Sequence, residues 1–290
     1  MATELGSPGI VEVRVPGRSV RHDLRAIKIV LHRELLRFVN DRTRMVSTLV
    51  QPVLWLFVMG TGLGTLISRG PVQGVDFRTF MYPGVIAMTV ITTAMFSAGS
   101  IVWDREFGFL REMLVAPVGR ASIVLGKCLG GGVVATVQGV IILALAGLVH
   151  VPYSPALILT LLGEMFLASF TITAFGVSLA ARMKNMQSFF GVMQMAIMPM
   201  IFLSGAMFPL ANLPAWLAFL TKINPLTYAV DPMRHAVFTH LSVNPRIVQT
   251  LNPGVHWFGW RVPTGVELGI VALMGLALLG VAIAQFRRAD

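Results

Sequence analysis

Two long stretches of this chain carry no charged side chain, and they restrict its fold more than any other feature. Residues 80–103 form a run of 24 uncharged residues, and residues 128–163 form a run of 36 in which His150 counts as neutral. The hydrocarbon core of a bilayer is about 30 Å thick and takes roughly 20 apolar residues to cross as a helix. The first run is therefore long enough to span a membrane once, and the second is long enough to span it twice.

The composition points to the same class of protein. Hydrophobic residues make up 55% of the chain and charged residues 12%, about half the charged share of a typical soluble domain. We therefore expect an all-α polytopic membrane protein. The start of the chain lacks the apolar core of a cleaved signal peptide, so we expect residues 1–20 to remain as a flexible tail and the first span to act as the targeting signal.

Uncharged runs along the whole chain predict six membrane-crossing helices. A turn at 150–155, where two prolines stand three residues apart, divides the longer run into two spans. The predicted spans cover residues 45–68, 80–103, 128–149, 156–181, 188–207 and 268–286.

Lysine and arginine residues are distributed unevenly over the segments between these spans. Of the 23, 17 fall on the side of the N-terminus and six on the opposite side. Because cytoplasmic loops are enriched in basic residues, both termini are predicted to face the cytoplasm. This bias accounts for every basic residue, so the net charge of +10 indicates attraction to anionic lipid headgroups and requires no nucleic-acid partner.

An amphipathic helix is predicted just before the first span, over residues 21–44. Its basic residues mostly fall away from an apolar stripe, as in helices that lie in the membrane interface and direct cationic side chains to lipid phosphates. Bracing of a cytosolic partner is a second interpretation of the same helix. The apolar stripe consists of Leu24, Ile27, Leu31, Leu35 and Phe38.

The charged segment 104–120 separates the second predicted span from the third. Phe107, Leu110 and Leu114 share one helical stripe, while side chains of both charge signs project away from it. Pro117 ends the short predicted helix. The mixed charge favours a protein partner over lipid alone, and a solvated helix without a partner is the alternative.

Two motifs carry a resemblance to a known family. The first is Arg105-Glu106-x-Gly108-x-Leu110-x-x-Met113-Leu114-x-x-Pro117-Val118-x-Arg120, followed by Gly126-Lys127. The second joins Phe202-Leu203-Ser204-Gly205, Phe208-Pro209, Leu213-Pro214 and Asn224-Pro225-Leu226-Thr227-Tyr228, and ends with Asp231 to Arg234. With these motifs the chain resembles, over about residues 25–288, the membrane subunits of ABC-2 type exporters, a family that includes drug-resistance, lipo-oligosaccharide and polysaccharide exporters.

The resemblance implies a homodimer of six-helix subunits in a bacterial inner or plasma membrane. Two separate ATP-binding subunits would dock on the cytoplasmic side, hold ATP and Mg, and drive export by hydrolysis. The segment 104–120 looks like the family's coupling segment. The residues expected to couple to the ATPase are Asp104, Arg105, Glu106, Phe107, Gly108, Leu110, Arg111, Met113, Leu114, Pro117 and Arg120.

The chain itself is not expected to be an enzyme or to hold a cofactor or metal. The closest approach to a phosphate-binding G-x-x-x-x-G-K-[ST] loop has Ala121 in place of the first glycine and Cys128 where Ser or Thr would ligate magnesium. His235 and His240 do not share a helical face and belong to no H-E-x-x-H motif, which gives zinc hydrolysis little support.

Residues 208–264, between the last two predicted spans, begin with a stretch too apolar for an ordinary loop. The resemblance implies re-entrant helices here that form part of an outer gate, with 215–223 dipping back into the membrane. A plain interfacial belt of aromatic residues is the alternative. The candidate gate residues are Phe208, Pro209, Leu213, Pro214, Trp216, Asn224, Pro225, Tyr228, Asp231 and Arg234.

Glu164 is the only clear carboxylate inside a predicted span, about nine residues beyond Pro155. A lone charge at that depth is costly, so we expect this side chain to be protonated, paired or turned toward a polar cavity. Gln51, Gln138 and Gln194 are candidate hydrogen-bond partners. A role in transport and a purely structural hydrogen bond both fit the pattern.

Methionines recur every seven residues along the fifth predicted span, from Met186 to Met207. Flexible thioethers suit the wall of a pathway for hydrophobic cargo, and helix packing at a dimer interface explains them equally. Residues of the candidate transport pathway are Gln51, Glu164, Met193, Gln194, Met200 and Met207.

Together these features are interpreted as the membrane-spanning subunit of an exporter for a hydrophobic or amphipathic compound, such as a drug, a lipid or a glycolipid. Polysaccharide export is the alternative within the family. A proton-coupled secondary transporter that works without an ATPase is the alternative outside it, although we find no convincing internal repeat of the kind such proteins often show.

Overall fold

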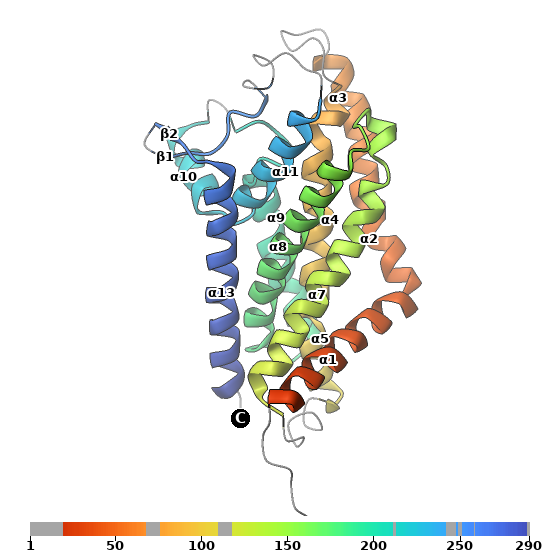
Figure 1. The fold of residues 1–290 in the computed structure, drawn as a ribbon, viewed down its shortest axis with the longest axis vertical. Coiled ribbons are helices and arrows are strands. Elements are labelled where there is room, and N and C mark those ends of the chain that lie inside the picture. Colours follow the sequence, from red (N-terminus) through yellow and green to blue (C-terminus); the bar gives the residue numbers. More distant parts are fainter. Residues whose placement is uncertain are drawn as a thin grey trace, which may run out of the picture.

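The computed structural model describes residues 20–67, 76–109, 118–210, 213–241, 248, 251–257 and 259–288, without the side chains of 65–67, 287 and 288. The predicted tail therefore lies almost entirely outside the described residues. Figure 1 shows an elongated helical bundle in which α1 and the end of α13 lie at the same end as α5. We call this the α5 end, and the opposite end, which holds α10 and two short strands, the α10 end.

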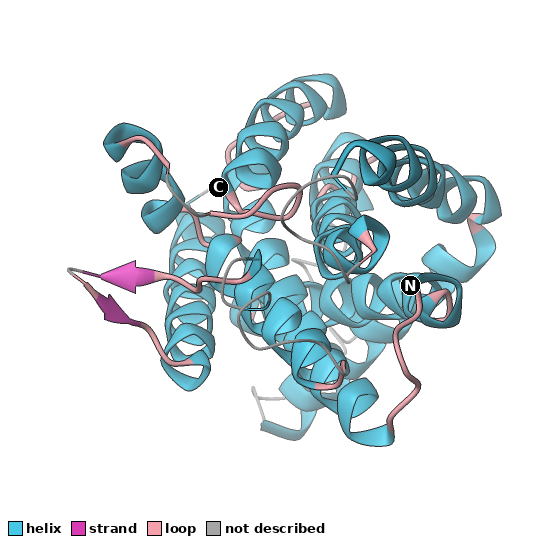
Figure 2. Cartoon of the chain, turned by 90° about the horizontal axis from the view of Figure 1, so that it is seen from above, coloured by secondary structure: helices cyan, strands magenta, loops and turns pink. Residues whose placement is uncertain are grey.

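Nearly all described secondary structure is helical. Two strands, β1 (His256–Trp257) and β2 (Trp260–Arg261), pair antiparallel as a small hairpin at the margin of the bundle (Figure 2). The helices are α1 (Val20–Asn40), α2 (Arg42–Leu54), the π-helical η1 (Trp55–Met59), α3 (Gly60–Ile67), α4 (Phe77–Ala98), α5 (Ser100–Glu106), α7 (Arg120–Leu143), the 3-10 turn η2 (Ala146–Val149), α8 (Pro155–Ala180), α9 (Met186–Leu203), α10 (Ala215–Ile223), α11 (Thr227–Thr239) and α13 (Thr264–Arg288).

Six helical stretches in the described part of the chain are long and apolar enough to cross a membrane. This confirms the all-α polytopic class and the predicted number of spans. The stretches are Arg42–Gly64, Phe77–Glu106, Arg120–Leu143, Pro155–Ala180, Met186–Leu203 and Thr264–Phe286.

Helix α4 lies at the centre of the bundle, packed against α7 and α8. Its span is 89% buried inside the chain, whereas the spans built from α2 to α3, α9 and α13 are each only 22% buried. The exposed faces of these three peripheral spans are apolar, with Leu54, Met195 and Leu273 among the exposed side chains. Such faces suit contact with lipid or with another membrane helix, neither of which requires polar side chains.

Helix α1 packs against α7. Two glycines of α7 allow this approach, because a Cβ on Gly126 would come within 2.9 Å of Val30 and one on Gly130 within 3.0 Å of the Glu34 side chain. The predicted amphipathic helix over 21–44 is also divided. Helix α1 ends at Asn40, and Asp41 caps α2 by accepting a hydrogen bond from the Arg44 backbone N–H at 3.0 Å.

Most span boundaries differ from the prediction, and three of the differences have a physical cause in the structure. Helix α7 begins at Arg120, eight residues early, because Lys127 pairs with carboxylates inside the protein and need not reach the headgroups. Helix α9 ends at Leu203 because the chain then turns through Gly205, whose φ of +74° favours glycine. Helix α13 begins at Thr264 and buries Glu267 in its first turn, where the helix dipole favours a carboxylate.

Candidate functional site

A cluster of charged side chains joins three helices at the α5 end. Arg33 and Glu34 come from α1, Asp104 from α5 and Lys127 from α7. We call these four residues the ion cluster. Glu34 and Lys127 face each other where the glycines of α7 let α1 approach, so close helix packing and charge pairing occur at one place.

Lys127 is the centre of the ion cluster. Its Nζ lies 2.9 Å from Glu34 Oε1 and 2.7 Å from Asp104 Oδ2, and it donates a hydrogen bond to Ser100 Oγ at 2.8 Å. Arg33 pairs with the other oxygen of Asp104. The Asp104 side chain is fully buried, and those of Lys127 and Glu34 are 2% and 5% exposed. Charges this deeply buried are tolerated only when they are paired, so the three helices are held in one arrangement.

The ion cluster corrects one expectation about the coupling segment. Asp104 is predicted above to couple to the ATPase, but its carboxylate is buried and already paired within the chain. It therefore does not present a surface to a partner. The hydrophobic pattern alone places Asp104 on a charged loop, because the sequence does not show that α1 folds back to cover it.

Arg105 and Glu106 hold the turn between α8 and α9. Arg105 donates hydrogen bonds to the carbonyl oxygens of Met183 at 2.6 Å and Ala181 at 3.0 Å. Glu106 accepts a hydrogen bond from the Met186 backbone N–H at 3.2 Å, at the start of α9. Two side chains of the predicted coupling segment therefore bind this chain's own backbone and connect α5 to α9.

An exposed aromatic surface continues from the end of α5. Trp103, Phe107 and Phe109 are 44%, 63% and 51% exposed, and we call them the aromatic edge. Gly108 lies between the two phenylalanines with a φ of +81°. Further along, Gly119 N–H donates to Asp23 of α1 at 3.0 Å, and Arg120 contacts the Phe286 carbonyl at 3.4 Å. The predicted coupling residues Leu110, Arg111, Met113, Leu114 and Pro117 lie outside the described residues.

Helix α5 is thus connected to most of the bundle at one end. The ion cluster joins it to α1 and α7, and Arg105 and Glu106 join it to α8 and α9. It also follows directly from the central helix α4 after Gly99. A displacement of the segment after α5 would therefore act on five helices at once, which is the mechanical property that a coupling element needs.

At the α10 end, Arg234 of α11 fastens the turn that follows α9. Its Nη2 donates to the Gly205 carbonyl at 2.5 Å and lies 3.4 Å from the Ala206 carbonyl, and its guanidinium stands 4.4 Å from the centre of the Phe80 ring. Burial lowers the pKa of Arg234 to about 10, with Asp231 acting in the opposite direction. The guanidinium therefore stays charged at neutral pH, and carbonyl oxygens and an aromatic face compensate it.

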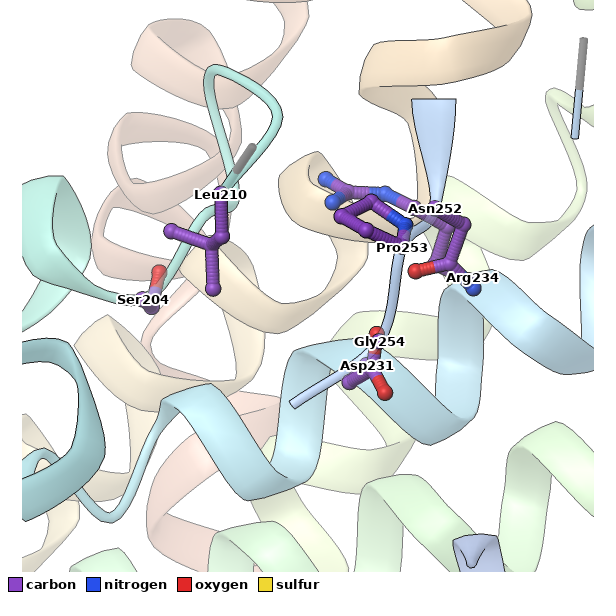
Figure 3. A pocket seen from close by; sticks show the side chains of 7 residues that line it. All are labelled: Ser204, Leu210, Asp231, Arg234, Asn252, Pro253 and Gly254. Atoms are coloured by element: carbon purple, nitrogen blue, oxygen red, sulfur yellow. The ribbon is translucent and has the colours of Figure 1, made fainter. Parts of the chain in front are cut away.

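Two further predicted gate residues lie close to the same turn. Asn224 donates to the Met200 carbonyl at 2.7 Å, which pulls the α10–α11 connection onto α9. A small cavity of about 10 Å³ lies beside Ser204, and Asp231, Arg234 and Asn252 are among the residues that line it (Figure 3). The Arg234 Nε and Asn252 Nδ2 atoms have no hydrogen-bond partner among the described residues. A space of this size and polarity suits one bridging water.

Of the other predicted gate residues, one is buried and the rest are partly or fully exposed. Tyr228 is buried, and its hydroxyl donates to the Lys222 carbonyl at 2.7 Å and accepts from Trp257 Nε1 at 3.0 Å. Burial raises the pKa of this tyrosine. Trp216 on α10 is 66% exposed. Partly exposed positions are Phe208, Pro209, Leu213, Pro225 and Asp231, and Pro214 is exposed.

The predicted partners of Glu164 are elsewhere. Gln138 donates to the Met45 carbonyl at 2.7 Å and to Thr48 Oγ1 at 3.0 Å, while Gln51 and Gln194 occupy exposed positions on α2 and α9. Glu164 is 5% exposed, and its Oε2 has no hydrogen-bond partner among the described residues. Glu267 is a second carboxyl group that interacts electrostatically with Glu164, and the prediction missed it because it stands just before the uncharged run of α13.

Replacing Glu164 with glutamine should change the free energy of unfolding by no more than about 1 kcal/mol, because no cation in the described part of the chain pairs with this carboxyl and the amide keeps its shape. Unfolding of purified protein in mixed micelles measures this difference. A loss well above that value would show that the carboxyl has an attractive partner.

The predicted pathway residues do not come together in one subunit. Met193 is buried, Glu164 interacts with Glu267 of α13, and Gln51 and Gln194 are exposed on separate helices. Met200 instead lines an apolar cavity of about 630 Å³ between α8, α9, α10 and α13. Met207 is partly exposed beyond the end of α9. The other walls of this cavity include Phe175, Met195, Leu220 and Met274.

Known proteins are similar to this chain over most of its length. Residues 25–238 match the protein family described as "ABC-2 type transporter". The "Putative transport permease ycf38" of Cyanophora paradoxa is 29% identical over 222 residues, which cover 74% of each chain. The "Inner membrane transport permease YadH" of Escherichia coli (strain K12) is 27% identical over 215 residues, covering 72% of this chain and 82% of YadH.

A third relative is similar over a shorter length. The "Probable multidrug ABC transporter permease YbhR" of Escherichia coli (strain K12) is 32% identical over 158 residues, which cover 54% of this chain and 43% of YbhR.

Proposed function

This chain belongs to the ABC-2 type transporter family, and we propose that it is the membrane-spanning subunit of an ATP-driven exporter. It is a multi-pass membrane protein of the transport-permease class. The proposed complex contains two copies of this chain and two ATP-binding subunits, which carry the ATP and Mg. The basic α5 end, with both termini, would face the cytoplasm, where a bacterial inner-membrane exporter meets its ATPase.

The observation that carries this proposal is the connection of α5 to five helices beside an exposed aromatic edge. ATP-driven closure of the partners would push on the segment that follows α5. The ion cluster would transmit this movement to α1 and α7, and Arg105 and Glu106 would transmit it to α9. Helix α9 ends at the turn that Arg234 fastens, so the movement would reach the α10 end.

The cavity beside α9 supports a hydrophobic or amphipathic cargo. It is apolar, its volume of about 630 Å³ lies in the range of small-molecule sites, and it is bounded by two of the three peripheral spans. The relative YbhR is named as a probable multidrug permease, which agrees with a cargo of this class. We therefore propose export of a drug, lipid or glycolipid from the cytoplasm or inner leaflet.

Substitutions in the aromatic edge test whether the ATPase partner binds there. Replacing Phe107 and Phe109 with alanine should reduce recovery of a Walker-type ATPase at least about tenfold when the tagged chain is purified in mild detergent, since two exposed aromatic anchors are lost. Mass spectrometry of the co-purified proteins gives the readout. The matched control is Trp216→Ala with Phe219→Ala, because Phe107 and Phe219 are both 63% exposed but lie at opposite ends.

Equal ATPase recovery for both double variants would contradict docking at the aromatic edge. Failure to recover any ATPase with the unchanged chain would contradict the ATP-driven mechanism itself and would favour a carrier that works alone.

A further inference from the structure

A third cavity, of about 180 Å³, lies at the α5 end between the α1–α2 junction and α9. Its polar side is formed by Arg37, Asp41 and Arg44, and its apolar side by Phe96, Trp103 and Phe190. None of the mechanical connections described above uses Arg44. The cavity stands where two membrane-spanning stretches meet the surface, since one begins at Arg42 and another ends at Glu106.

Arg44 is a half-buried cation without a salt bridge. No carboxylate oxygen among the described residues lies within 4.0 Å of its guanidinium. Its side-chain contacts are a hydrogen bond of 3.4 Å to Ser97 Oγ and the Phe96 ring, whose centre is 5.5 Å from the guanidinium carbon. Asp41 is the nearest acid in sequence, but its Oδ1 accepts the Arg44 backbone N–H at the start of α2.

The positive charge of Arg37 is also compensated only in part. Its Nη2 is 3.8 Å from Asp104 Oδ1, an oxygen that Arg33 already engages, and its guanidinium carbon is 6.0 Å from the centre of the Trp103 ring. The ion cluster together with Arg37, Asp41 and Arg44 contains four cations and three carboxylates. Two of these cations, Arg37 and Arg44, line the cavity together with one of the carboxylates, Asp41.

The apolar side of the cavity continues along the membrane. Phe190 is followed on the same face of α9 by Gln194, Met198 and Phe202, all of them exposed. A ligand with an anionic head in the cavity would therefore have an apolar surface beside it for acyl chains. Arginine suits the head of such a ligand because its planar fork forms paired hydrogen bonds with phosphate oxygens.

We propose that this cavity binds the phosphate group of an anionic phospholipid from the leaflet at the α5 end, between Arg37 and Arg44. The bound lipid would join the α1–α2 junction to α9 and would place its phosphate charge beside the two arginines. This site does not depend on the identity of the cargo or of the ATPase.

The test uses purified full-length protein, stripped of lipid in an uncharged detergent and titrated with phosphatidylglycerol. Native mass spectrometry measures the fraction of protein that retains lipid. Arg44→Gln should weaken retention of the first phosphatidylglycerol about tenfold, since it removes a charge-assisted contact with phosphate. Arg42→Gln is the matched control, because it removes the same charge two residues away at an exposed position that does not line the cavity.

Two further measurements test whether the variants are folded and whether the ligand is a lipid. Both variants should elute and unfold like the unchanged protein without lipid. If Arg44→Gln does not fold, Arg37→Gln, which removes the other arginine of the cavity, replaces it and should weaken retention in the same way. Inorganic phosphate at the same concentration should not displace phosphatidylglycerol. Equal weakening in Arg42→Gln and Arg44→Gln would overturn a specific site, and displacement by inorganic phosphate would overturn a lipid as its ligand.

Discussion

Replacing Lys127 with methionine should destabilise the folded subunit by about 3 to 5 kcal/mol, because it leaves two carboxylates buried without their shared cation. Glu34 and Asp104 both face the Lys127 ammonium at less than 3 Å. Arg33 compensates Asp104 in part, but Glu34 would keep only its hydrogen bond from Ser100. The helices that the ion cluster joins would separate, and the connection from α5 to α1 and α7 would be lost.

Unfolding in mixed micelles measures this loss, and Lys184→Met is the control because Lys184 is exposed in the turn between α8 and α9. A second variant, Lys127→Met with Glu34→Gln, should recover part of the lost stability, since it removes one of the two unpaired charges. If Lys127→Met unfolds like the unchanged protein, the ion cluster does not hold the three helices together.

Replacing Gly84 with alanine should destabilise the α10 end by about 1 to 3 kcal/mol, although alanine is the better helix former. A Cβ at this position would stand 2.1 Å from the Ala206 carbonyl oxygen and 2.8 Å from its Cα. Both contacts are with backbone, so no side-chain rotation relieves them. The turn after α9 would have to move away from α4, and Arg234 would lose the carbonyl groups that compensate its charge.

The matched variant is Gly163→Ala, an identical change in α8 where a Cβ meets nothing within 4 Å. Here the lower conformational entropy of the unfolded chain should stabilise the protein by about 0.5 to 1 kcal/mol. Thermal unfolding of the two variants should thus shift in opposite directions. A shift of Gly84→Ala in the same direction as Gly163→Ala would mean that α4 and the α9 turn are not in close contact.

The six spans were predictable because each is a local property of the sequence. A run of about 20 apolar residues identifies a crossing helix wherever it packs, and all six predicted spans overlap one of the helical stretches observed. The boundaries were less predictable. The uncharged runs place Lys127 and Glu267 at the edges of spans, but both are buried within helices, and Lys127 is paired there with carboxylates of α1 and α5.

The coupling role of the segment from Asp104 to Arg120 stays a prediction. Charge patterning indicated that the segment binds a protein, and the structure connects its start to α1, α7, α8 and α9. The pattern did not show that Asp104, Arg105 and Glu106 bind their own chain. The sequence pattern assigns no role to Glu34 or Arg44, because the surroundings of both side chains depend on how α1 folds back against α7.

The class of protein, the number of spans and the family resemblance can all be read from the sequence, because they rest on hydrophobicity and residue spacing along the chain. Which charges are paired, which aromatic residues are exposed and where the cavities lie depend on how distant parts of the chain pack together. The ion pair between Glu34 and Lys127, for example, requires α1 to meet α7 at Gly126 and Gly130. These glycines lie 92 and 96 positions after Glu34 in the sequence. No local pattern of residues records such a meeting.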